Sequence, residues 1–77
     1  MESGSPFAPT GPLLGTVERF DTHSCLGEVV DAAGRTWPFQ CTALVDGTRE
    51  VAPGTEVTFV VVPRNGGRLE ADRLVTR

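Results

Sequence analysis

Apolar and polar residues alternate along most of the chain after residue 12. The clearest case is residues 56–62, where Val57, Phe59 and Val61 fall on one face of an extended segment and Glu56, Thr58 and Val60 on the other. A period of two residues, with many residues branched at Cβ, is typical of half-buried strands. The same reading predicts four more strands, at residues 13–20, 26–30, 35–40 and 68–75.

Turn signals separate these predicted strands. Residues 21–24 form a polar turn, residues 31–34 a tight hairpin closed by Gly34, and Asn65-Gly66 a second hairpin turn. A short helical turn at residues 41–44 and a loop at 45–53 make the third connection the longest. Five short strands in this arrangement predict an all-β fold, a small five-stranded antiparallel Greek-key barrel of the oligonucleotide-binding type.

The 77 residues are enough for one small domain. Residues 1–12 are rich in glycine, proline and serine, with Phe7 as their single large apolar residue apart from Met1. We predict a flexible tail at residues 1–12 and the barrel domain at residues 13–77, because so few apolar groups do not offset the entropy of ordering. Docking of Phe7 on the domain is the alternative.

Charge limits the classes of partner. The formal net charge is −3, and all seven basic residues are arginines. An acidic domain does not attract a polyanion over long distances, so any nucleic-acid binding has to be local. The absence of lysine is typical of a GC-rich, bacterial genome. Neither a bilayer-spanning apolar run nor a secretory signal pattern is present, which predicts a cytoplasmic protein without membrane contact.

Four short motifs carry a resemblance to a known family. They read GTVERFD at residues 15–21, SCLGEV at 24–29, WPFQCTAL at 37–44 and GTEVTF at 54–59. In order and spacing, residues 13–76 resemble a cold-shock domain, whose motifs read GxVKWFN, KGFGFI, VFVHFSAI and GxxVxF. The resemblance implies a five-stranded barrel that binds single-stranded RNA or DNA.

The resemblance also implies which side chains point into the barrel and which point out. The inward set is retained as Val17, Gly27, Val29, Trp37, Phe39, Leu44 and Phe59. The outward positions, which carry aromatic side chains in the family, here hold Arg19, Leu26, Glu28, Pro38, Gln40 and Cys41, with Thr48 in a loop. Phe20 is the one aromatic residue left among them.

The loss of these aromatic residues predicts weak binding, because one stacked base is worth about 1–3 kcal/mol. Glu18 and Glu28 on the same face would also repel phosphates. Arginine can stack on bases through its guanidinium plane and restore part of the affinity. The candidate nucleic-acid-binding residues are Arg19, Phe20, Leu26, Arg35, Gln40 and Arg49.

A protein-interaction module is the alternative function. It would use Leu26, Pro38 and an exposed edge formed by Val60 and Val62. The arginines near the last hairpin, Arg64, Arg68 and Arg73, are either a weak phosphate-binding patch or a solubilising edge.

Catalytic and metal-binding chemistry finds little support in the residues. His23 is the only histidine and has no nucleophile to activate, and Glu18, Asp21 and Glu28 lack the spacing of a metal site. We therefore expect no enzymatic activity, no cofactor and no metal. Cys25 and Cys41 are predicted to face each other across the second and third strands; two thiols are expected in a reducing cytosol, and a disulfide is the alternative.

Overall fold

The computed structural model describes residues 11–47 and 50–77. Its strands are β1 (Leu13–Asp21), β2 (Leu26–Asp31), β3 (Thr36–Gln40), β4 (Glu56–Pro63) and β5 (Leu69–Thr76), with two short 3-10 turns, η1 (Cys41–Ala43) and η2 (Asn65–Gly67). Every predicted strand is confirmed, with boundaries that differ by one residue at most.

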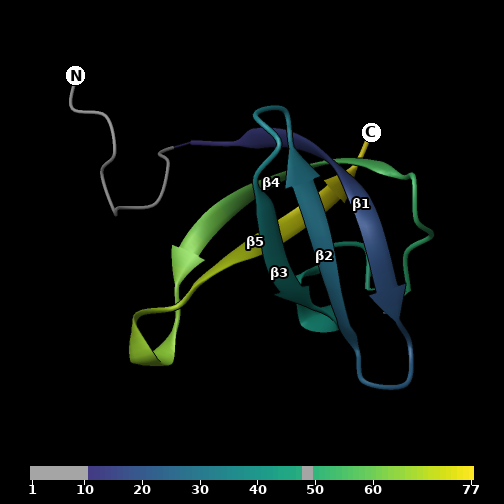
Figure 1. The fold of residues 1–77 in the computed structure, drawn as a ribbon. Helices are drawn as coiled ribbons and strands as arrows, with labels where there is room; N and C mark the ends of the chain where they lie inside the picture. The colour runs from purple at the N-terminus through teal and green to yellow at the C-terminus, as the bar shows by residue number, and fades with distance from the viewer. Residues whose placement is uncertain (1–10, 48–49) are drawn as a thin grey trace.

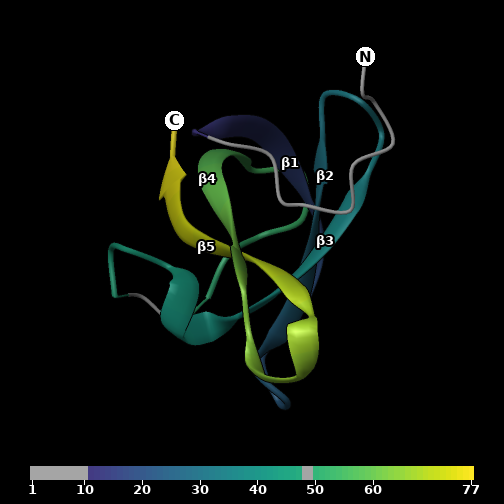
Figure 2. The ribbon, with the colours of Figure 1, turned by 90° about the vertical axis from the view of Figure 1, so that its left-hand side faces the viewer.

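The five strands form one sheet in the order β3-β2-β1-β4-β5, and every neighbouring pair is antiparallel. The two outer strands, β3 and β5, also contact each other, because the sheet curls on itself (Figures 1 and 2). A parallel bridge between Leu44 and Leu74 joins the chain after η1 to β5. The predicted all-β, five-stranded antiparallel barrel is therefore confirmed.

The core lies inside the curl of the sheet. Its most buried side chains are Val17, Val29, Phe39, Val57 and Phe59, each at most 1% exposed. Burial of each stabilises the fold by about 1.5–3 kcal/mol. Trp37, predicted to point inward, is half-buried and packs against this core from one end.

A β-bulge in β1 changes which side chains face the core. The register shifts between Val17, opposite Val29, and Arg19, opposite Glu28, so that Glu18 is the extra residue. Phe20 then lies opposite Gly27 and points inward, where its ring stacks on that of Phe39 with 5.8 Å between centroids and 9° between planes. The prediction that Phe20 stands on the outer face is wrong, because the bulge reverses the alternation.

Two further predictions are corrected, one by the turn η1 and one by the sheet order. Cys41, expected on the outer face, is 7% exposed and packs in the interior. The exposed edge expected at Val60 and Val62 is not an edge, because β4 lies between β1 and β5 and both valines are half-buried.

The β2–β3 hairpin is held by a buried carboxylate. Asp31 Oδ1 accepts hydrogen bonds from the backbone N–H groups of Ala33 and Arg35, and Oδ2 accepts from Arg35 Nε and Trp37 Nε1, each at 2.9 Å. The Arg35 guanidinium also lies 5.5 Å from the centroid of the Trp37 ring. Burial alone would raise the pKa of the Asp31 carboxyl, but these hydrogen bonds outweigh it and hold the pKa below its ordinary value of 3.8.

Candidate nucleic-acid interface

The candidate site is built from two rows of side chains that cross β1, β2 and β3. Register places Arg19 beside Glu28 and Glu28 beside Pro38 in one row. In the other row Asp21 lies beside Leu26, and Leu26 beside Gln40. Partners in neighbouring strands point to the same face of a sheet, so both rows form one surface.

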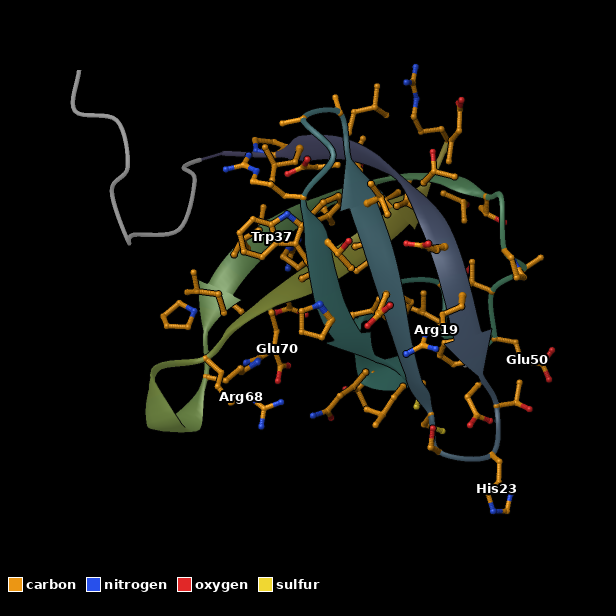
Figure 3. All side chains as sticks on the ribbon, viewed as in Figure 1. Arg19, His23, Trp37, Glu50, Arg68 and Glu70 are labelled. Atoms are coloured by element: carbon orange, nitrogen blue, oxygen red, sulfur yellow. The ribbon has the colours of Figure 1, made fainter. Side chains whose placement is uncertain are left out.

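This surface is hollowed into a groove. A depression of about 560 Å³ is lined by both rows, by Ser24 in the β1–β2 turn, and by Arg68 and Glu70 of the last hairpin. A second depression of about 640 Å³ continues it past Pro63 and Arg64, sharing Gln40, Arg68 and Glu70 with the first. In Figure 3, Arg68 and Glu70 lie together on one side of β3, and Arg19 lies beyond β2 on the other.

One wall of the groove is the outer edge of β3. The N–H of Asp31 bonds to the carbonyl of Arg35, and the N–H of Cys41 bonds to the carbonyl of Cys25, both at 2.9 Å. The backbone N–H and C=O groups of odd-numbered residues of β3 therefore point toward β2. Those of even-numbered residues point away from β2, toward the outer edge of the sheet. Pro38 fits here because its nitrogen stands where no ladder hydrogen bond is made.

Charges in the groove are largely paired. Arg19 Nε lies 3.3 Å from Glu28 Oε1, and Arg64 lies 3.4 Å from Glu70 and 3.3 Å from Asp72. Arg68 forms no ion pair with any residue that the structure describes, and it lines both depressions. Among the arginines that line the groove, Arg68 can therefore bind an anionic group without first breaking an ion pair.

Three of the six predicted binding residues come together in the groove: Arg19, Leu26 and Gln40. Phe20 lies instead on the inner face of the sheet, where it packs against the core. Arg35 sits at the opposite end of the β2–β3 hairpin, held by Asp31 at 2.9 Å. Arg49 lies outside the described residues, as does Thr48.

Arg68 was anticipated only as part of a possible phosphate-binding patch near the last hairpin, and Glu70 was not among the predicted site residues. Their position follows from closure of the barrel, which brings β5 next to β3 although some 30 residues separate them in the chain. The arginine-flanked turn was visible in the sequence, but nothing in the strand pattern indicates that it faces β3.

The remaining candidates for chemistry do not form a common site among the described residues. The side chains of Cys25 and Cys41 are thiols and do not form a disulfide. The two residues are linked by a backbone hydrogen bond, in which the Cys41 N–H donates to the Cys25 carbonyl. His23 is exposed at the tip of the β1–β2 turn (Figure 3). Across residues 11–47 and 50–77, no three His, Cys, Asp or Glu side chains are arranged to hold a metal ion.

Within the same ranges, the structure has no helix of the length and apolarity that a membrane span requires. Comparison of the chain with models of known protein families and with curated proteins finds no match.

Proposed function

We propose that the groove binds single-stranded RNA or DNA weakly, in a cytoplasmic protein of the cold-shock type. The observation that carries the proposal is the place of the groove. It crosses β2 and β3 between the β1–β2 turn and the β4–β5 turn. Oligonucleotide-binding barrels hold their ligands on the same strands and between the same two loops.

The lining explains why the binding is weak. Its one aromatic residue is Phe39, which is 1% exposed and offers no open ring face to a base. Guanidinium groups and the Gln40 amide remain as contacts, without stacked bases that would each add about 1–3 kcal/mol. We expect dissociation constants on the order of 10–100 µM at low salt, in the range of non-specific binding.

Fluorescence anisotropy with a labelled mixed-sequence 10-nucleotide strand tests the proposal at 20 and 200 mM salt. Arg68→Ala should weaken binding about 3- to 10-fold at low salt and reduce the salt slope by about 1, as expected for the loss of one phosphate contact. Arg77→Ala is the matched control, because it removes the same charge from the exposed C-terminal end. No binding at 20 mM salt, or equal losses in both variants, would contradict the proposal.

A protein-interaction module remains the second candidate, favoured by the apolar part of the groove. Leu26 is 53% exposed, and Pro38 beside it is also exposed. Because the charges around these two residues are paired, the net electrostatic field there is small and does not favour a polyanion over a protein. A partner protein held there should be lost from Leu26→Asp and retained by Arg68→Ala, whereas an oligonucleotide in the same groove should be weakened by both variants.

A further inference from the structure

A second surface, with no residue in common with the groove, carries a row of exposed aliphatic side chains. Leu14 lies opposite Thr58 in the β1–β4 pairing, and Thr58 lies opposite Val75 in the β4–β5 pairing. The parallel bridge of Leu44 to Leu74, with the N–H of Val45 bonded to the carbonyl of Leu74 at 3.1 Å, brings Val45 beside Val75. We call these four residues the apolar row.

Three of the four large hydrophobic residues exposed in the described structure belong to this row: Leu14 at 44%, Val75 at 47% and Val45 at 56%. With strands about 4.8 Å apart, the row is about 14 Å long. Scattered exposed aliphatic residues are ordinary, but their alignment across β1, β4, β5 and the chain after η1 makes a continuous surface.

The size of the row limits what can cover it. A stable interface between separate proteins buries about 800 Å² on each partner, and three half-exposed aliphatic side chains and a threonine offer far less. One phenyl ring buries about 150–250 Å², which suits a surface of this size.

A covalent link between the occupant and the domain can compensate for the small area of this surface. The described chain begins at Gly11, three residues before Leu14, and Gly11 has a φ of +80°, the left-handed region that lets a chain turn. Phe7 is four residues further back, a reach of about 13–14 Å. A covalent link of this length gives an effective concentration in the millimolar range, so a contact too weak for a free partner can form.

We propose that the apolar row is the docking site for the chain's own N-terminal segment, with Phe7 as the residue that covers Leu14 and Val75. The sequence agrees with this occupant, because Phe7 is the only aromatic side chain in the first twelve residues. Cold-shock-type binding in the groove is not required for this contact.

Methyl NMR of the full chain tests the proposal. The ring protons of Phe7 should show nuclear Overhauser effects to the methyl groups of Leu14 and Val75, and Phe7→Ser should shift those methyl resonances. Ala8→Ser is the matched control and should leave them in place. Val75→Thr, which nearly keeps the side-chain shape, should weaken the Phe7 contacts without unfolding the protein.

Two results would overturn the proposal. The first is identical methyl positions for Leu14 and Val75 in the wild-type protein and in Phe7→Ser. The second is a shift of the row's methyl groups that depends on protein concentration and persists in Phe7→Ser, which would assign the row to contact between two copies of the chain.

Discussion

Replacing Asp31 by alanine tests how the β2–β3 hairpin is held. The substitution removes one carboxylate that accepts four hydrogen bonds of 2.9 Å and is itself only 6% exposed. The bond from Trp37 is made to a charged acceptor, and such a bond contributes about 1.5–3 kcal/mol. The half-exposed ion pair with Arg35 adds at most about 1 kcal/mol, and water can partly replace the carboxylate as acceptor for the two backbone N–H groups.

The loss of unfolding free energy should therefore be about 3 kcal/mol, measured by urea denaturation at pH 7. For a domain of this size the melting temperature should fall by roughly 12–24 °C. Asp31→Asn should cost about 2 kcal/mol, because the side-chain amide keeps one acceptor for the turn but presents N–H groups to Trp37. Glu18→Gln removes the same charge at an exposed site and should change stability by less than about 0.5 kcal/mol.

The pH dependence of Asp31 follows from the sign of its pKa shift. The pKa of the folded carboxyl lies below its ordinary value of 3.8, so the stabilisation is complete above that value and is lost as the pH falls through the folded pKa. The stability difference between the wild-type protein and Asp31→Asn should be constant from pH 7 to 5 and shrink below about pH 4. A difference that stays constant down to pH 2, or an alanine variant within about 0.5 kcal/mol of wild type, would refute the idea that the Asp31 carboxylate holds the β2–β3 hairpin.

Three other predictions concern the sheet and the thiols. Gly27→Ala should cost about 1–3 kcal/mol in urea denaturation, because a Cβ there would lie 2.7 Å from the Phe39 ring; Glu28→Ala should change little. Phe20→Leu should leave oligonucleotide affinity unchanged, since the ring faces the core, and a large loss of affinity would return it to the binding surface. Cys25 should react with Ellman's reagent much faster than buried Cys41; two equally fast thiols would contradict the described packing.

Most of the fold could be predicted from local patterns. Alternation located all five strands, and the turn residues Asp31–Gly34 and Asn65–Gly66 located two of the three hairpins, because backbone conformation at these points depends on a few neighbouring residues. Phe20 and Cys41 were misplaced for different reasons. A bulge at Glu18 reversed the alternation for Phe20, and η1 turned Cys41 into the interior.

The candidate site could be predicted only where it follows one hairpin. Leu26 and Gln40 lie on facing strands, so the sequence placed them together with Arg19. Arg68 enters the groove through the closure of the barrel, which is a long-range event that no local pattern reports. Arg35 lies outside the groove because it pairs with the buried Asp31, and the sequence does not distinguish a buried aspartate from a turn aspartate.

The prolines of β3 and β4 have a consequence for the behaviour of this protein in concentrated solution. Pro38 stands on the outward-facing side of β3, and Pro63 lies opposite Leu69 near the end of β4. A foreign strand approaching β3 meets a missing donor at the middle of a five-residue template, so self-templated, amyloid-like growth from this border is disfavoured. The outer edge of β3, which forms one wall of the groove, can thus stay exposed without becoming a seed for aggregation.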